Sequence, residues 1–134
     1  NNGPEAHAAG VFTSNRFQAA PVRWSIDAVA DGRLAAVVLN SGGANACTGP
    51  QGFQDTHRTA ELVAAALDIS AGDVVVCSTG LIGELLPMDL IEAGIGLAVD
   101  GLDADGGSAA ATHPGRAASA LQGSHQARGP HLPV

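Results

Sequence analysis

Residues 34–45 read Leu-Ala-Ala-Val-Val-Leu-Asn-Ser-Gly-Gly-Ala-Asn, a continuous apolar run followed directly by a cluster of small residues. An apolar run of this length is typical of a buried strand, and the Asn-Ser-Gly-Gly composition is typical of a turn. Residues 74–80 repeat the arrangement, because Val-Val-Val-Cys precedes Ser-Thr-Gly. The sequence therefore predicts two buried strands, 34–39 and 74–77, each followed by a loop of small residues.

Apolar residues at helical spacing predict helices around these strands. One helix follows Pro21 and stops before Gly32, a second spans 56–67, and a third begins near Pro87. Their apolar faces are formed by Val22, Ile26 and Val29, by Ala60, Val63, Ala64 and Leu67, and by Met88, Ile91 and Ile95. A short apolar run at 8–13 predicts a further strand. Helices alternating with buried strands indicate an α/β architecture.

Length and charge limit the class of protein. The chain has 134 residues, enough for one small domain. Its 13 acidic residues outnumber its six basic ones, all Arg, and the net charge of -7 counts against nucleic acid or an anionic membrane as partner. No apolar stretch approaches the roughly 18 residues of a membrane span, and no secretory signal begins the chain, so we expect a cytoplasmic protein. Cys47 and Cys77 form no disulfide framework, so we expect a reducing compartment and buried thiols.

The distribution of charge divides the chain near Asp105. Every acidic residue lies at or before Asp105, whereas the only formal charges beyond it are those of Arg116 and Arg128. The segment 106–134 is rich in Gly, Ala, Ser, Pro and His and has no sustained hydrophobic period. Such a composition buries too little apolar surface to offset the entropy of ordering. We therefore expect a folded region, 1–105, and a tail, 106–134, that is disordered or foreign to the fold.

Two loops of small residues are the candidate functional sites. In the first, 39–49, glycines allow close approach of the backbone to a ligand, and neutral side chains can bind substrate or brace the backbone. Its candidate residues are Asn40, Ser41, Gly42, Gly43 and Asn45. In the second, 77–84, a sharp turn at Thr-Gly can present donors to a developing negative charge, as an oxyanion hole requires. Taken alone, both loops are more often ordinary turns.

Other site classes lack support in the sequence. A P-loop is excluded because the chain has no Lys, and the glycines at 94 and 96 lack the third Gly of a dinucleotide fingerprint. Ser78 is not in a nucleophile elbow. Cys47 and His57 are better explained as a structural thiol and a surface imidazole than as a catalytic pair. No His pair has metal-ligand spacing on one helix, so no metal site is expected.

Five stretches of the sequence, in order, resemble a known family. They are AAGVFTSNR at 8–16, AAPV at 19–22, LNSGGANACTG at 39–49, STGLIG at 78–83 and LPM at 86–88. Together they are similar to the N-terminal, α-chain part of the bifunctional glutamate N-acetyltransferase/ornithine acetyltransferase family of arginine biosynthesis. The resemblance covers residues 1–100 and is specific, because several independent motifs occur in the order that the family has.

The resemblance implies an activity and an assembly. The activity is acetyl transfer from N-acetylornithine to glutamate, with acetyl-CoA as an alternative donor and no bound cofactor. Family precursors cut themselves into two chains, and the Thr that begins the β chain becomes the nucleophile. The family pattern assigns stabilisation of the oxyanion to Thr79 and Gly80 of this sequence. It also implies a layered α/β/β/α sandwich, incomplete in this chain, and an α2β2 heterotetramer formed with the β chain.

The sequence also departs from the family. The Thr-Thr-Asp-Thr segment, the Lys-Gly-x-Gly-Met-Ile segment and the Pro-Asn-Met-Ala-Thr cleavage site do not occur in it. The resemblance fades after about Asp105, and 109–134 resembles translation in a shifted frame or an unrelated extension. We therefore expect a fragment that is inactive by itself. The alternatives are a non-catalytic interaction module that associates with a partner chain and, with the least support, an N-terminal-nucleophile aminopeptidase, which would lack the motifs at 8–13 and 40–49.

Overall fold

The computed structural model describes residues 6–102. Its elements, in chain order, are β1 (Ala6–His7), α1 (Ala20–Ala28), β2 (Arg33–Leu34), β3 (Ala36–Gly43), α2 (Gly49–Leu67), the 3₁₀-helix η1 (Ala71–Asp73), β4 (Val74–Leu81) and α3 (Met88–Asp100). This mixture confirms the predicted α/β class. The expected boundary at residue 105 and the tail 106–134 lie outside the described residues.

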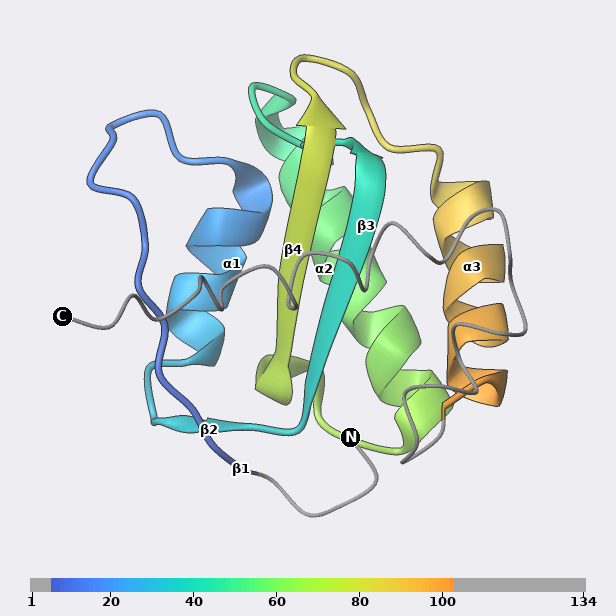
Figure 1. Cartoon of the computed structure of the whole chain (residues 1–134). Helices are drawn as coiled ribbons and strands as arrows, with labels where there is room; N and C mark the ends of the chain where they lie inside the picture. The colour runs from blue at the N-terminus through green and yellow to red at the C-terminus, as the bar shows by residue number, and fades with distance from the viewer. Residues whose placement is uncertain (1–5, 103–134) are drawn as a thin grey trace, which may run out of the picture.

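A parallel pair of strands organises the fold. β3 and β4 are hydrogen-bonded neighbours, in a register that runs from Ala36 opposite Val74 to Gly43 opposite Leu81. The connection between them contains α2, as parallel strands require a long crossover. Figure 1 shows the two strands side by side, with α2 behind them and α1 and α3 on either side. β1 and β2 form a separate, short antiparallel pair.

Both central strands are longer than the sequence predicts. The turns expected at 40–45 and at 78–80 are wrong in part, because β3 continues to Gly43 and β4 to Leu81. The parallel ladder supplies the reason. Each glycine-containing segment pairs with the other, so the partner strand satisfies backbone groups that a turn would leave to solvent. Local composition alone does not reveal such a partner.

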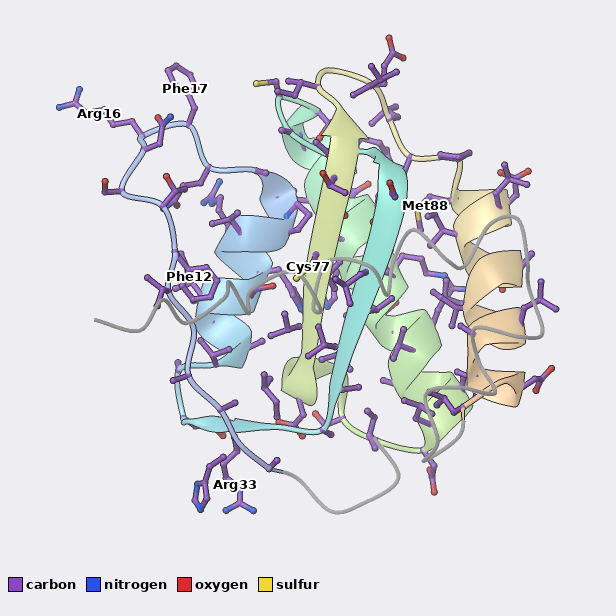
Figure 2. The ribbon with its side chains drawn as sticks, in the orientation of Figure 1. Phe12, Arg16, Phe17, Arg33, Cys77 and Met88 are labelled. Atoms are coloured by element: carbon purple, nitrogen blue, oxygen red, sulfur yellow. The ribbon has the colours of Figure 1, made fainter. Side chains whose placement is uncertain are left out.

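The strand predicted at 8–13 is also wrong. β1 ends at His7, and a single backbone hydrogen bond, from Ala8 N–H to Gly32 O at 2.8 Å, continues its association with the β2 region. Within residues 6–102 no strand pairs with the segment beyond β1, and Val11 is fully exposed. In Figure 2 Arg16 and Phe17, which follow this segment, point away from the rest of the described chain. An apolar run without a neighbouring strand has no ladder to join.

The three predicted helices are present. α1 and α3 begin close to Pro21 and Pro87, as expected. α2 begins at Gly49 rather than at the predicted Thr56. The prediction began too late because the first turn carries no apolar period, although Pro50 is a residue that favours the first turn of a helix. The end of α2 is set by Asp68, which adopts a left-handed conformation (φ 56°).

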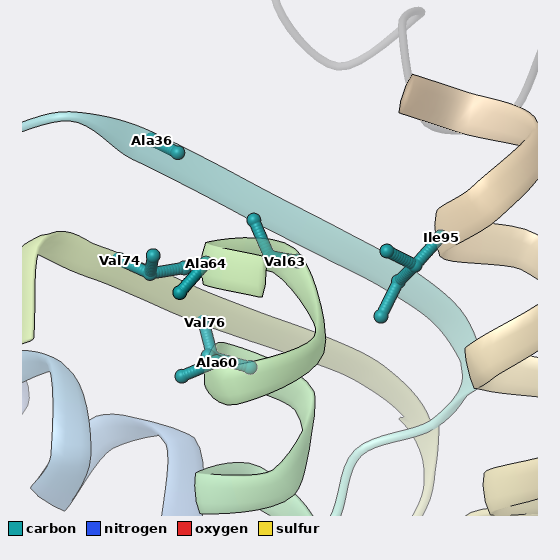
Figure 3. Close-up of a cluster of buried hydrophobic side chains, with 7 residues drawn as sticks. All are labelled: Ala36, Ala60, Val63, Ala64, Val74, Val76 and Ile95. Atoms are coloured by element: carbon teal, nitrogen blue, oxygen red, sulfur yellow. The ribbon is translucent and has the colours of Figure 1, made fainter. Parts of the chain in front are cut away.

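Small side chains form the core, on one face of the β3–β4 sheet. The buried cluster consists of Ala36, Ala60, Val63, Ala64, Val74, Val76 and Ile95 (Figure 3). Alanines on α2 let that helix lie close to the strands. The opposite face carries Val37, Leu39, Ser41, Cys77 and Thr79, and we term it the open face. Val37 and Leu39 are 54% and 55% exposed there, so the prediction of fully buried strands is correct for one face only.

Helix α1 occupies the outer edge of β4. The Trp24 indole Nε1–H donates to Val74 O at 2.9 Å. The Ser25 hydroxyl donates to Val76 O at 2.9 Å and accepts from Val76 N–H at 3.2 Å. Two side chains of a helix thus take the place of a third strand, and they satisfy backbone groups that would otherwise be unpaired next to the core.

Replacing Ser25 by Ala is expected to lower the free energy of unfolding by about 1–3 kcal/mol, because both buried backbone groups of Val76 lose their partner. Urea titration followed by the fluorescence of Trp24, the single Trp of the chain, measures this change. The matched control is Ser70→Ala, which removes an exposed hydroxyl that accepts from Gly72 N–H. Equal losses for the two variants would contradict the assigned role of Ser25.

Candidate active site

The register of the parallel strands brings the two candidate loops together. Asn40 lies opposite Ser78, Ser41 opposite Thr79, and Gly42 opposite Gly80. Sequence alone treats the segments as two separate loops, whereas in the fold they form one end of one sheet. We refer to this end, 40–43 and 78–81, as the strand-end site.

Thr79 lies in an extended strand, not in the sharp turn that the sequence suggests. Its side chain is exposed on the open face, next to the exposed Ser41 of β3. Within residues 6–102 the Thr79 hydroxyl has no protein partner, so it is available to donate to a ligand that approaches this face. No ionised side chain is present in the strand-end site, whose polar side chains are amide and hydroxyl groups.

Two glycines allow the strands to approach closely beside Thr79. Gly42 and Gly80 have φ of +131° and +133°, values that side chains of L-residues rarely adopt. A Cβ atom on Gly80 would lie 2.4 Å from the carbonyl carbon of Gly42 and 2.5 Å from its oxygen. The position is therefore restricted to glycine by backbone conformation and by space. Gly80 itself is exposed.

The Asn40 side chain braces the backbone of both strands. Its Oδ1 accepts a hydrogen bond from the Ser78 hydroxyl at 2.5 Å, and its Nδ2 donates to Gly43 O at 3.2 Å. The sequence left substrate contact and bracing as alternatives for this residue. The hydrogen bonds of the side chain, which is half-buried, favour bracing.

Asn45 has a similar role deeper in the protein. It is fully buried with a left-handed backbone (φ 48°). Its Nδ2 donates to Gly52 O at 2.7 Å and to Thr56 Oγ1 at 2.9 Å, and its Oδ1 accepts from Thr48 Oγ1 at 2.7 Å. The whole carboxamide is therefore used to hold the loop after β3 against the first turns of α2.

Backbone hydrogen bonds join the segments that follow the two strands. Ala44 N–H donates to Leu81 O at 2.8 Å, and Gly83 N–H donates to Ala46 O at 2.8 Å. A Cβ on Gly43 would lie 2.8 Å from the buried Leu86 side chain, so this glycine is packed rather than free. Of the five candidates in the first loop, Ser41 and Gly42 are exposed, and Gly43 is half-buried.

The expectation of buried thiols is wrong, because Cys47 and Cys77 are both exposed and unpaired. Cys47 lies in the loop before α2, and Cys77 (labelled in Figure 2) lies on the open face, which no described element covers. Partial desolvation raises the pKa of the Cys77 thiol, so the protonated form is favoured at neutral pH. The His57 ring packs on Trp24, with 4.6 Å between ring centroids.

Two hollows in the described part of the chain are lined by residues outside the strand-end site. A hollow of about 340 Å³ lies between the first turns of α1 and α2 and is lined by Arg23, Cys47 and Phe53 among others. Another, of about 160 Å³, is apolar and lies between β3 and α3. Across residues 6–102, no group of three or more His, Cys, Asp or Glu side chains could hold a metal ion. None of the helices in that range is long and apolar enough to cross a membrane.

Sequence reasoning missed the role of three hydroxyl residues that hold Asn40 and Asn45 in place. Ser78 is the partner of Asn40, and Thr48 and Thr56 are the partners of Asn45. The i, i+4 spacing of Thr48, which precedes α2, and of Gly52 and Thr56 within it could have suggested that these residues lie on one side of the start of the helix. Ser78 could have been paired with Asn40 only from the register of the two strands.

Solved structures with the same fold define the class of protein. An ornithine acetyltransferase from Mycobacterium tuberculosis, solved with ornithine bound, matches with a TM-score of 0.72 and 59% identity over 75% of this chain and 54% of its own. The arginine biosynthesis bifunctional protein ArgJ of Bacillus halodurans matches with a TM-score of 0.67 and 44% identity, over 69% and 49% of the two chains. The fold is therefore that of ornithine acetyltransferases, and it is present here in part.

The sequence profile described as the ArgJ family matches residues 1–123. The arginine biosynthesis bifunctional protein ArgJ of Streptomyces avermitilis is 65% identical over 111 residues, and that of Thermobifida fusca is 63% identical over 111 residues. Each alignment covers 83% of this chain and 29% of the relative. The chain belongs to the ArgJ family, and it spans about 29% of the length of these relatives. The profile match runs past Asp105, where the composition changes.

Proposed function

We propose that this chain forms part of an acetyltransferase of arginine biosynthesis, which moves an acetyl group from N-acetylornithine to glutamate. The strand-end site is the observation that carries the proposal. It presents the Thr79 hydroxyl on an exposed sheet face, beside Gly80, which is itself exposed. Family membership supports the same assignment, because the relatives are ArgJ proteins and the solved neighbour binds ornithine.

In this proposal Thr79 and Gly80 stabilise the oxyanion that forms when the acetyl carbonyl becomes tetrahedral. A fixed donor next to that oxygen lowers the barrier because it strengthens its bond as negative charge develops. The neutral surroundings suit this role, since no carboxylate of the strand-end site opposes the charge. No bound cofactor is needed for such a step, and acetyl-CoA is a possible alternative donor.

The nucleophile of the proposed reaction is the Thr that begins a β chain of the same precursor, released by autocatalytic cleavage. Its own α-amine activates the hydroxyl. The open face of β3 and β4 exposes Val37, Leu39 and Leu81, apolar side chains that a partner layer would bury. We propose that the β chain supplies this layer in a cytoplasmic α2β2 assembly, and that the 134 residues by themselves transfer no acetyl group.

A chimera tests the proposal in a complete enzyme. Residues 6–102 of this chain replace the aligned segment of the Streptomyces avermitilis relative, which is 65% identical to this chain over 111 residues. We expect the chimera to cleave itself, to form N-acetylglutamate from N-acetylornithine and glutamate, and to carry an acetylated Thr that mass spectrometry detects. In the second arm of the experiment, the β chain of the relative is added in trans to the 134-residue chain, and the formation of N-acetylglutamate is measured again.

The rival is a non-catalytic module that only associates with a partner chain. It predicts a chimera that assembles but transfers no acetyl group above the level of a chimera with a substituted nucleophile. That result, obtained with a folded and cleaved protein, would overturn the proposed function. Acetyl transfer by the 134-residue chain alone would instead show that the nucleophile is misassigned.

A further inference from the structure

We propose that Asn40 and Ser78 are a positioning pair, which holds Thr79 and Gly80 in place for the oxyanion of the transferred acetyl group. This inference rests on the proposed function and deepens it. Neither member contacts the reacting atoms in our assignment. Both act through the backbone of the strand-end site.

The side chains of the pair lie on the opposite face of the sheet from Thr79. Strand side chains alternate between faces, so Ser78 projects from the helix-covered face and Thr79 from the open face. Asn40 and Ser78 are both half-buried, whereas Thr79 is exposed. The Ser78 hydroxyl therefore cannot share a ligand with Thr79 directly, but it fixes the backbone from which the Thr79 side chain departs.

One carboxamide joins both strands at this end of the sheet. Asn40 Oδ1 accepts from the hydroxyl of Ser78 on β4 at 2.5 Å, and Nδ2 donates to the carbonyl of Gly43 on β3 at 3.2 Å. Between these contacts lies the close approach of Gly42 and Gly80. The two hydrogen bonds thus bracket the position of the oxyanion donors.

Glycines explain why such a pair is needed. Cross-strand contacts between side chains are the usual source of sheet stability. Gly42, Gly43 and Gly80 have no side chains and so make no such contacts. Glycine also has the largest conformational freedom to lose. The hydrogen bond between the half-buried side chains of Asn40 and Ser78 compensates for the missing side-chain contacts and for the conformational freedom of the glycines. Because amide and hydroxyl are neutral, the link adds no charge that would oppose the developing oxyanion.

Kinetics of the full-length chimera test the positioning pair. Ser78→Ala and Asn40→Ala are each expected to lower kcat roughly 10-fold, a smaller effect than loss of a donor itself, because a displaced donor still binds the oxyanion but less well. KM for N-acetylornithine is expected to change by no more than about twofold. Ser78→Thr keeps the hydroxyl and is expected to retain most of the activity. Ser70→Ala, which lies before η1 and outside β4, is the matched control and leaves kcat unchanged.

A double-mutant cycle separates positioning from a purely structural role. If Ser78 acts through Thr79, Ser78→Ala lowers kcat much less in a Thr79→Ala background than in the chimera with Thr79 present. A structural role predicts the same factor in both backgrounds. If Ser78→Ala does not yield folded enzyme, Ser78→Cys, which is similar in size and a weaker donor, takes its place in the cycle.

The outcomes distinguish this inference from the proposed function. If Thr79→Ala lowers kcat but Ser78→Ala and Asn40→Ala do not, the positioning pair is wrong and the oxyanion assignment stands. The positioning pair would also be wrong if Ser78→Ala lowered kcat by the same factor with Thr79 present and in the Thr79→Ala background. If Thr79→Ala itself leaves kcat unchanged, the oxyanion assignment fails, and the positioning pair fails with it.

Discussion

Replacing Thr79 by Ala in the chimera is expected to lower kcat for acetyl transfer by about 10²-fold, the scale for loss of one oxyanion donor. The hydroxyl is exposed on the open face and has no protein partner within residues 6–102, so its removal breaks no hydrogen bond of the fold. KM is expected to change much less than kcat, because the contact strengthens only as the carbonyl becomes tetrahedral. Steady-state kinetics with N-acetylornithine and glutamate give both constants.

Thr79→Ser is the matched variant, since it restores the hydroxyl without the methyl group. We expect it to recover most of the lost activity, whereas Thr79→Val, which keeps the shape, should remain as slow as Thr79→Ala. A kcat for Thr79→Ala equal to that of the unsubstituted chimera would show that Thr79 is only a strand residue. A parallel loss of activity and thermal stability would show the same.

Replacing Gly80 by Ala is expected to lower the free energy of unfolding by about 3 kcal/mol or more and to remove most of the activity. Two costs combine at this position. A φ of +133° is strained for any residue with a Cβ, and that Cβ would lie 2.4 Å from a backbone atom of Gly42, which cannot rotate away. The strands must separate at their ends, which displaces Thr79. Urea titration of the Gly80→Ala chimera measures the loss of stability, and an acetyl-transfer assay of the same preparation measures the loss of activity.

Gly83 supplies the control for Gly80. It has a φ of +86°, but a Cβ there would meet nothing within 4 Å. Gly83→Ala thus carries the conformational cost alone, about 1–2 kcal/mol. The difference between the two variants isolates the close approach of the strands. Equal destabilisation by the two substitutions would contradict the packing of Gly80 against Gly42.

Much of the fold was predictable because its signals are local. The spacing of Val22 and Ile26 gives one helix, and the prolines at 21 and 87 mark helix starts. Residues 74–77 form a strand as predicted, and Val74 and Val76 are in the core. Ala60, Val63 and Ala64, expected on one helix face, share that core. Each prediction depends on residues a few positions apart.

The errors arose where the partner of a segment decides its structure. Residues 40–43 have the composition of a turn, yet they extend β3 because 78–81 lie beside them. The apolar run at 8–13 has the composition of a strand, yet no strand in the described part of the chain pairs with it. The Cys77 thiol was expected to be buried because the two cysteines form no disulfide framework, but strand alternation places it on the open face. Composition does not specify which face a sheet buries.

The sequence by itself determined the α/β class, the helices, the core of small residues, and the motifs that the ArgJ family profile matches. It also singled out Thr79, Gly80 and Asn40. Only the tertiary structure decided how these residues are used. The hydrogen bond between Ser78 and Asn40 spans 38 positions of the chain, and the contact of Gly80 with Gly42 depends on the same register. Register is set by how α2 packs its face on both strands at once, which is a property of the assembled layers and not of any short segment.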